Sequence, residues 1–304
     1  MIAIVGPTAS GKTGFAIELA KRLNGEIVGV DASQVYRDMD IGTGKATSAE
    51  LGDIRHHLID VVAPDAPFDA RSFALAAENA VKGIETRGRL AILCGGTGFY
   101  LRSFLDGLCD APPVASHIRD ELKELVEKGG AQALHRELSV VDAKTAERLN
   151  PNDQQRLERA LGVYRTTGRP LSDWHNESPA GEPRDVAVFG IRWERALLNE
   201  RIEARVDMML EQGWVEEVKA LRGAGYDEAL RSMAAIGYRV LASYLDGEIT
   251  LRDARSKIIV ATRRYAKRQM TWFRGESRVQ WLDAPLEMES AIDAVTKCFL
   301  RKGS

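Results

Sequence analysis

Eight consecutive residues near the start of the chain have the types and spacing of a phosphate-binding loop. They are Gly6, Pro7, Thr8, Ala9, Ser10, Gly11, Lys12 and Thr13. Glycine permits backbone conformations in which successive N–H groups face one anion. Lys12 adds a full positive charge, and the Thr13 hydroxyl can bind Mg²⁺. The motif indicates a phosphorylated ligand without saying which one. The alternative is a glycine-rich turn that binds nothing.

Two further polar residues follow apolar runs that read as strands. Asp31 comes directly after residues 26–30, and Thr97 follows residues 90–94. A carboxylate near a bound anion can act as a general base or bind a metal, but Asp is also a favoured helix N-cap. Thr97 can likewise contact a substrate or cap a helix. Their positions alone leave both alternatives open for each residue.

A third segment, Lys267–Arg274, interleaves basic and aromatic side chains. Cations suit phosphates and flat rings suit unstacked bases, so this composition is typical of nucleic-acid binding. It equally suits an amphipathic helix whose Trp272 and Phe273 belong to the core. The formal net charge is only −2, although nine basic residues face two acids between Arg252 and Arg278. Any nucleic-acid surface is therefore expected to be local.

These residues need a scaffold, and the pattern of apolar runs predicts one. Strands are expected at 2–5, 26–30, 90–94 and 186–193, with a helix after the loop and another over 73–84. Strands that alternate with helices indicate a parallel α/β sheet. Ligands of such sheets bind beyond the carboxyl ends of the strands, which is where Lys12, Asp31 and Thr97 fall.

The pattern becomes helical after residue 112, with helices expected at 118–128, 131–139, 143–149 and 153–167. Further long helices are expected at 197–212 and 254–273. We therefore expect an α/β fold with a P-loop NTPase-like parallel sheet, a helical insertion and a largely helical C-terminal part. The predicted boundaries are 1–112 for the first part of the core, 113–183 for the insertion and 184–304 for the completion of the core.

Other features exclude several protein classes. Cys94, Cys109 and Cys298 form no CxxC pair, which argues against a disulfide framework or a structural zinc site. The adjacent His56 and His57 are expected to be structural residues of a strand. No apolar run is long enough to span a membrane, and no secretory signal is visible. We expect a cytoplasmic protein that acts as a monomer.

The ordered set of motifs closely resembles the tRNA dimethylallyltransferases, which prenylate the adenosine 3′ of the anticodon. The matching segments are GPTASGKT at 6–13, DASQVYRDMDIGTGK at 31–45, HHLIDV at 56–61, GGTGFY at 95–100, NPNDQQRLERAL at 150–161, RIEARVDMML at 201–210, IGYR at 236–239 and KRQMTWFR at 267–274.

The resemblance implies a role for each site. The loop would hold the diphosphate of dimethylallyl diphosphate, with Mg²⁺ at Thr13 as cofactor. Asp31 would be the general base at the adenine N6, Thr97 would contact the reaction centre, and Arg205 would hold the diphosphate. The product would be N6-isopentenyladenosine at position 37 of tRNAs that read codons beginning with U.

The resemblance also implies a tRNA-binding set, which includes the insertion as a grip on the anticodon stem-loop. Its members are Asp31, Ala32, Ser33, Gln34, Thr97, Arg119, Gln155, Arg156, Leu157, Glu158, Arg159, Ala234, Ala235, Ile236, Gly237, Tyr238, Arg239, Lys267, Arg268, Gln269, Met270, Thr271, Trp272, Phe273 and Arg274.

Three other functions are compatible with the loop. A small-molecule P-loop kinase would consume ATP, but it would give the segment 267–274 no role. An isopentenyltransferase acting on free adenine nucleotides should lack most of the tRNA-contact segments. A non-enzymatic P-loop regulator or RNA-binding module would leave Asp31 and Thr97 without a task.

Overall fold

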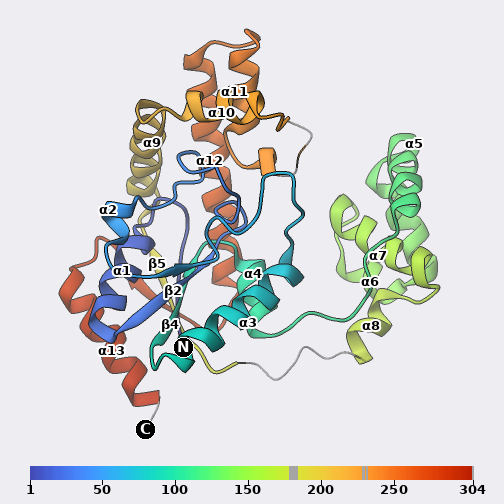
Figure 1. Cartoon of the computed structure of the whole chain (residues 1–304). Helices are drawn as coiled ribbons and strands as arrows, with labels where there is room; N and C mark the ends of the chain where they lie inside the picture. Colours follow the sequence, from blue (N-terminus) through green and yellow to red (C-terminus); the bar gives the residue numbers. More distant parts are fainter. Residues whose placement is uncertain (178–183, 228–229, 231, 303–304) are drawn as a thin grey trace. The chain divides into compact units, whose positions relative to one another are not determined.

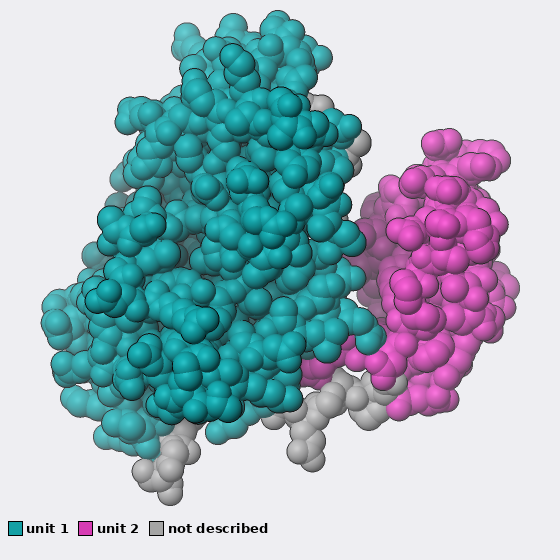
Figure 2. All heavy atoms as spheres, in the orientation of Figure 1, with its two compact units in different colours: residues 1–105, 184–304 teal, residues 106–183 magenta. Residues whose placement is uncertain are grey.

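The computed structural model describes residues 1–177, 184–227, 230 and 232–302, and the chain forms two compact units. Unit 1 combines Met1–Leu105 with Arg184–Ser304, and unit 2 is Asp106–Pro183 (Figure 2). Residues 178–183, at the end of the expected insertion, lie outside the described residues. The ends of unit 1 that flank unit 2 meet directly, because the N–H of Arg184 donates to the carbonyl of Leu105 at 3.0 Å.

Unit 1 is built on a six-stranded sheet in the order β3-β2-β4-β1-β5-β6, and every pair of neighbours is parallel. The strands are β1 (Ile2–Val5), β2 (Gly25–Val30), β3 (His56–His57), β4 (Leu90–Gly95), β5 (Ala187–Arg192) and β6 (Val279–Asp283). Strands β1, β2 and β4 are almost wholly buried, as expected for continuous apolar runs in a sheet covered on both faces. The expected α/β fold with a parallel sheet is confirmed.

Helices cover both faces of this sheet (Figure 1). Helix α1 (Lys12–Leu23) packs with α13 (Met288–Lys302), and both contribute to an apolar cluster around β1, β4 and β5. Helices α3 (Ala70–Thr86) and α4 (Gly98–Leu105) pack together elsewhere on the sheet, where the rings of Phe73 and Tyr100 stack at 4.7 Å. A short helix, α2 (Ser48–Leu51), precedes β3.

The C-terminal helices of unit 1 adjoin the carboxyl edge of the sheet. They are α9 (Arg195–Glu211), α10 (Trp214–Gly223), the 3₁₀ turn η1 (Ser232–Ala234), α11 (Tyr238–Leu245) and α12 (Leu251–Arg274). Helix α12 packs against α9, α11 and α4. The largely helical C-terminal part is therefore observed.

Unit 2 is entirely helical where it is described. Its helices are α5 (Ser116–Val141), α6 (Ala143–Arg148), α7 (Gln154–Thr167) and α8 (Leu171–Glu177), which enclose a separate core of residues such as Leu134, Leu157 and Leu161. The sequence predicted two helices where α5 stands. The break between them is present at Gly130, whose φ of 64° is not helical and kinks α5 between its two halves, as the prediction of two helices expects. No helix of the described residues is both long and apolar enough to cross a membrane.

The sheet contains one buried carboxylate, Glu26 on β2, which is 1% exposed. Arg87 donates to both of its oxygens, at 2.9 and 2.7 Å, and the His57 ring lies 2.6 Å from one of them. The Arg87 bond, with a smaller contribution from His57, lowers the pKa of Glu26 to about 2 despite its burial. The structural role expected for His57 is thus satisfied, and His56 bonds the carbonyl of Ile54.

We expect this carboxylate to make stability pH-dependent. Because its folded pKa lies below its unfolded value, its contribution is complete above about pH 4.5 and is lost as pH falls towards 2. Between pH 6 and pH 3 the wild type should lose about 2 kcal/mol of unfolding free energy relative to Glu26→Gln. Urea titrations at both pH values measure this. The exposed Glu248→Gln serves as the control, and an equal pH dependence of wild type and Glu26→Gln would contradict the assignment.

Candidate functional site

The segment Gly6–Thr13 forms a tight loop at the carboxyl end of β1. Ala9 and Gly11 both have positive φ values, 62° and 84°, so the backbone turns sharply before helix α1 begins at Lys12. The N–H groups of a first helical turn have no acceptor within the helix and carry partial positive charge. A loop of this shape at a helix N-terminus is suited to a phosphate group.

Three side chains hold this loop from outside, a role that the sequence did not predict for any of them. Gln269 on α12 accepts from the Thr8 N–H at 2.8 Å, and Arg201 on α9 donates to the Ala9 carbonyl at 2.9 Å. Trp193 donates to the Ser10 carbonyl at 3.0 Å, and the Arg201 guanidinium lies 4.4 Å from a Trp193 ring centroid. Arg201 is one helical turn from Arg205 in the same motif, a spacing that could have drawn attention to it.

A pocket of about 320 Å³ opens beside the loop. It is lined by Thr8, Lys12, Thr13, Asp31, Ala32, Ser33, Gln34, Gly42, Thr43, Gly44, Cys94, Gly95, Ile202, Arg205, Val206, Met209, Trp214, Ala234, Ala235, Ile236, Thr262, Tyr265, Arg268 and Gln269. Segments far apart in the sequence therefore meet at the sheet edge that the strand pattern predicted. The structure brings Lys12, Thr13, Asp31 and Arg205 to one cavity.

Two half-buried cations, Lys12 and Arg205, and the carboxylate of Asp31 bring charge to this pocket. Burial lowers the pKa of Lys12, and Arg205 lowers it further, while Cys94 and Asp31 oppose these effects. Burial likewise lowers the pKa of Arg205, with Asp31 acting in the opposite direction. Arg205 makes one hydrogen bond, from Nη2 to the Gly44 carbonyl at 3.3 Å, and its buried Nε has no partner among the described residues. Two desolvated cations with spare donors favour an anionic ligand.

Asp31 caps a turn and also lines the pocket. Its Oδ1 accepts from the N–H groups of Ser33 at 2.8 Å and Gln34 at 3.3 Å, which is the capping geometry of a turn. Within the described parts of the chain, no hydrogen bond reaches the other oxygen, Oδ2. One oxygen therefore fixes the carboxylate and the second is available to a ligand in the pocket.

Thr97 does not cap α4 with its hydroxyl. Its Oγ1 accepts from the Ala32 N–H at 3.0 Å and so joins the loop after β4 to the loop after β2. Tyr265 on α12 lines the same pocket, and burial raises the pKa of Tyr265, which stays protonated. Thr97 thus supports the turn that contains Asp31, at the edge of the pocket.

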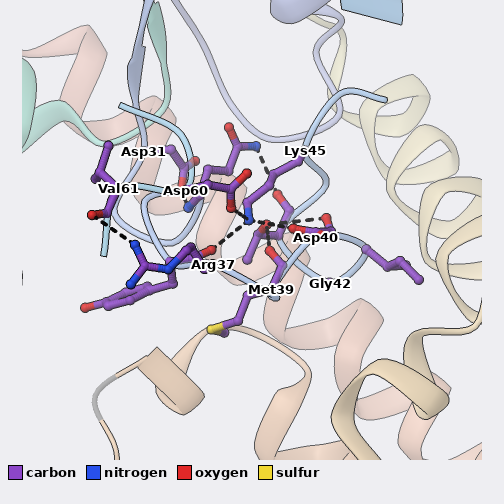
Figure 3. A network of polar contacts seen from close by, with 12 residues as sticks. Asp31, Arg37, Met39, Asp40, Gly42, Lys45, Asp60 and Val61 are labelled. Atoms are coloured by element: carbon purple, nitrogen blue, oxygen red, sulfur yellow. Dashed lines mark hydrogen bonds and ion pairs between the residues drawn. The ribbon is translucent and has the colours of Figure 1, made fainter. Parts of the chain in front are cut away.

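The loop that follows Asp31 is held by buried Lys45, whose side chain is 6% exposed (Figure 3). Lys45 donates to the Tyr36 carbonyl at 2.7 Å and to Asp40 at 2.6 Å, and it also pairs with Asp60. One ammonium group therefore ties two parts of this loop to the segment that follows β3.

The segment Lys267–Arg274 presents two different faces of α12: one packs into the core, as one interpretation predicted, and the other is exposed and basic. Lys267, Arg268, Thr271 and Arg274 are exposed, and Arg268 also lines the pocket. On the opposite face Phe273 is 1% exposed and Gln269 is 5% exposed, and Met270 and Trp272 are half-buried. Any contact of this segment with a macromolecule would come from the first set.

The segment Ala234–Arg239 divides in a similar way. Ala234, Ala235 and Ile236 line the pocket, while Arg239 is exposed. Gly237 and Tyr238 are buried, and the Tyr238 hydroxyl bonds Glu217.

The remaining predicted residues belong to unit 2. Arg119, Gln155 and Arg156 are exposed, Glu158 is half-buried, and Leu157 lies in the core of the unit. Arg159 donates to the carbonyls of Ala111 and Pro112 at 2.9 and 2.7 Å, which ties helix α7 to the start of the unit.

The oxygen donors of the pocket fit a magnesium ion that arrives with its ligand. Among the residues that the structure describes, no group of three or more His, Cys, Asp or Glu side chains is placed to hold a metal. The Thr13 hydroxyl and the Asp31 carboxylate are hard donors in the same pocket. Mg²⁺ is commonly bound by one or two protein oxygens together with substrate phosphates and waters. The Thr13 and Asp31 oxygens would supply the protein part of such a coordination shell.

The side chains of the pocket are suited to binding a diphosphate, stabilising it as a leaving group and accepting a proton. Lys12, Arg205 and the loop N–H groups favour negative charge as it develops on a departing anion. The free oxygen of Asp31 can receive a proton from a nucleophile bound nearby.

Comparisons with known proteins agree in pointing to one family. Residues 34–276 match the family model described as IPP transferase. A tRNA dimethylallyltransferase 2 of Geotalea uraniireducens is 46% identical over 98% of this chain and 97% of its own length. A tRNA dimethylallyltransferase of Geobacter metallireducens is also 46% identical, over 97% and 96% of the two chains.

Two solved structures match nearly the whole chain. The full-length tRNA isopentenylpyrophosphate transferase of Bacillus halodurans is 39% identical, with a TM-score of 0.73, and 99% of this chain and 95% of that chain are covered. A eukaryotic dimethylallyltransferase acting on tRNA is 27% identical with a TM-score of 0.84, covering 99% and 79% of the two chains.

Proposed function

The chain belongs to the IPP transferase family and transfers a dimethylallyl group to tRNA, and we propose that its target is N6 of adenosine 37, 3′ of the anticodon, in tRNAs that read codons beginning with U. The donor is dimethylallyl diphosphate and the products are N6-isopentenyladenosine and diphosphate. The observation that carries this proposal is the convergence of Lys12, Asp31 and Arg205 on one pocket beside the loop.

In the proposed reaction, N6 attacks the allylic carbon of the donor as the carbon–oxygen bond to diphosphate breaks. Positive charge that develops on the allylic carbon is delocalised, and the leaving diphosphate is stabilised by Lys12, Arg205 and the loop N–H groups. The N6 proton passes to Oδ2 of Asp31. Since the exocyclic amine becomes acidic only as the new bond forms, a carboxylate suffices as base.

Thr97 and Thr13 support this step in different ways. Thr97 holds the Ala32 N–H, so it fixes the turn that presents Asp31 to the target base. Thr13, with the diphosphate oxygens, would hold Mg²⁺, which when bound neutralises part of the charge of the diphosphate.

Recognition of tRNA is proposed to use the exposed cations on both units. In unit 1 these are Lys267, Arg268, Arg274 and Arg239, and in unit 2 they are Arg119 and Arg156. Unit 2 would grip the anticodon stem-loop. A target base must leave its stack to enter a pocket, at a cost of a few kcal/mol, and such contacts can offset this cost.

An assay with different acceptor substrates tests the proposal against the two alternative enzyme functions. The protein is incubated with Mg²⁺, labelled dimethylallyl diphosphate and, in turn, unmodified tRNA, AMP or ATP. We expect label in tRNA alone, located at position 37 after nuclease digestion. Transfer only to AMP would instead indicate an enzyme of free nucleotides, and ATP turnover without prenylation would indicate a kinase.

Arg268 should contribute a phosphate contact. We expect Arg268→Ala to weaken tRNA binding about three- to tenfold and to reduce the slope of log K against log salt by about 0.7 to 1. Filter binding at several salt concentrations measures both quantities. Arg252→Ala, an exposed arginine near the start of the same helix, is the matched control. An unchanged slope in Arg268→Ala would rule out the phosphate contact.

A further inference from the structure

Glu217, in the first turn of α10, accepts hydrogen bonds from three successive backbone N–H groups of the loop after Asp31. Its Oε2 accepts from Asp40 at 2.7 Å and from Ile41 at 2.6 Å, and its Oε1 accepts from Gly42 at 3.1 Å. Glu217 is at least 175 positions away in the sequence from each of the three residues that donate to it. A half-buried carboxylate therefore holds the backbone of a distant loop from outside.

Tyr238 on α11 gives this carboxylate a fourth hydrogen bond. The Tyr238 hydroxyl donates to Oε1 of Glu217 at 2.7 Å. Burial, and next the charge of Glu217, raise the pKa of Tyr238, so the hydroxyl remains a donor. Tyr238 is wholly buried and its hydroxyl faces the carboxylate. The tyrosine of the motif IGYR therefore has a structural role inside the protein.

The loop that Glu217 holds is one wall of the pocket. Gly42, Thr43 and Gly44 line the cavity. From the pocket side, Gln34 donates to the carbonyls of Thr43 and Gly44, both at 3.1 Å, and Arg205 donates to the Gly44 carbonyl. The loop thus lies between Glu217, which binds its N–H groups, and two proposed substrate-binding side chains, which bind its carbonyls.

Packing leaves this loop little room to move. A Cβ atom on Gly42 would overlap the indole of Trp214, and one on Gly237 would overlap the same ring. Trp214 and Tyr238 meet edge to face, with centroids 5.9 Å apart. Lys45 anchors the far end of the loop through Asp40 (Figure 3). Glycine at positions 42 and 237 therefore permits the close approach that the Glu217 bonds require.

We propose that Glu217 is a positioning residue for prenyl transfer. By holding the backbone of Asp40–Gly42, it fixes the pocket wall against which Arg205 and Gln34 are aligned, and so sets the geometry of the diphosphate site. This inference rests on the proposed function, because it assigns Arg205 to the donor diphosphate. A carboxylate is needed since its two oxygens can accept four bonds, whereas an amide has one oxygen and would turn its own N–H donors towards the loop.

Hydrogen exchange tests the clamp itself, independently of activity. In Glu217→Gln, the amides of residues 40–42 should exchange at least tenfold faster than in the wild type, read by mass spectrometry, while peptides from β1 and β4 keep their protection. Glu216→Gln, which makes the same charge change at the exposed neighbouring position, should leave the loop protected. Unchanged exchange in Glu217→Gln would overturn the proposal.

Kinetics test what the clamp does. We expect Glu217→Gln to raise KM for dimethylallyl diphosphate about tenfold and to lower kcat about tenfold, with the Kd for tRNA within twofold of the wild type. Tyr238→Phe, which removes one donor and keeps the ring, should show a smaller change in the same direction. A purely structural role would reduce the amount of active enzyme and leave KM unchanged, so a normal KM in Glu217→Gln would also overturn the proposal.

The two assays separate this inference from the function on which it rests. Wild-type protein that transfers no prenyl group would refute the proposed function and the kinetic half of the inference together. Faster exchange of the loop in Glu217→Gln would then still support the clamp as a structural fact, and unchanged exchange would refute that as well.

Discussion

Replacing Asp31 by asparagine should lower the rate of prenyl transfer by about 10³-fold, within the range of 10² to 10⁴ that a general base contributes. Asparagine keeps the side-chain oxygen that accepts from the N–H groups of Ser33 and Gln34, so the turn survives. What is lost is the carboxylate oxygen that no hydrogen bond occupies within the described structure. Asp31→Ala should be at least as inactive, since it removes both oxygens.

Single-turnover experiments with excess enzyme measure this rate without interference from product release. Binding of tRNA should stay within about threefold of the wild type, because the turn contributes only part of the contact surface. The control is Asp53→Ala, which replaces an exposed acid outside the motif 31–45. This variant should behave as the wild type. A rate for Asp31→Asn close to that of the wild type would remove Asp31 from the role of base.

The second large effect is expected for Lys12→Ala, which should lower kcat/KM for dimethylallyl diphosphate by about 10² to 10³-fold. Lys12 carries its charge at a half-buried site where desolvation already lowers its pKa. The free protein therefore gains little from this ammonium group, and its benefit appears only when a diphosphate is bound. Removing it should cost binding and catalysis without loss of folding stability.

Thermal unfolding with and without inorganic diphosphate separates these two effects. In the wild type, diphosphate with Mg²⁺ should raise Tm in proportion to the logarithm of its concentration above Kd. In Lys12→Ala that shift should vanish, while Tm without ligand stays equal to or above the wild-type value. Lys21→Ala, exposed on the same helix and paired with Glu18, is the control. A diphosphate shift retained by Lys12→Ala would show that the loop binds its anion without this side chain.

The sequence predicted best the features that depend on neighbouring residues. The loop Gly6–Thr13 and the strands that place Asp31 and Thr97 at one sheet edge follow from local patterns, and the structure has them there. Strand β6 was not predicted. It lies at the edge of the sheet with β5 as its single neighbour, and its residues are exposed or half-buried rather than uniformly apolar. Helices α10, α11 and α13 were likewise not distinguished from their surroundings by pattern alone.

The parts of the site that sequence reasoning missed are contacts between distant segments. Gln269 was assigned with its neighbours to RNA, but it lies 173 positions from Gly96, whose carbonyl it bonds at 3.0 Å. No periodicity in the sequence marks a glutamine that turns inward from a basic helix. The same holds for Glu217, which reads as an ordinary acid in the first turn of a helix, where negative charge is favoured by the dipole.

The order of strands in the sheet has a consequence for how the protein emerges from the ribosome. Strands β2, β3 and β4 and their helices are complete once residue 105 has been made, but β1 then has a neighbour on only one side. Its other neighbour, β5, is synthesised only after the whole of unit 2. Throughout that interval the nascent chain presents an unpaired edge made of Ile2–Val5, and such edges invite pairing with other chains. Unit 2 therefore sets the length of time for which the nascent sheet must be protected.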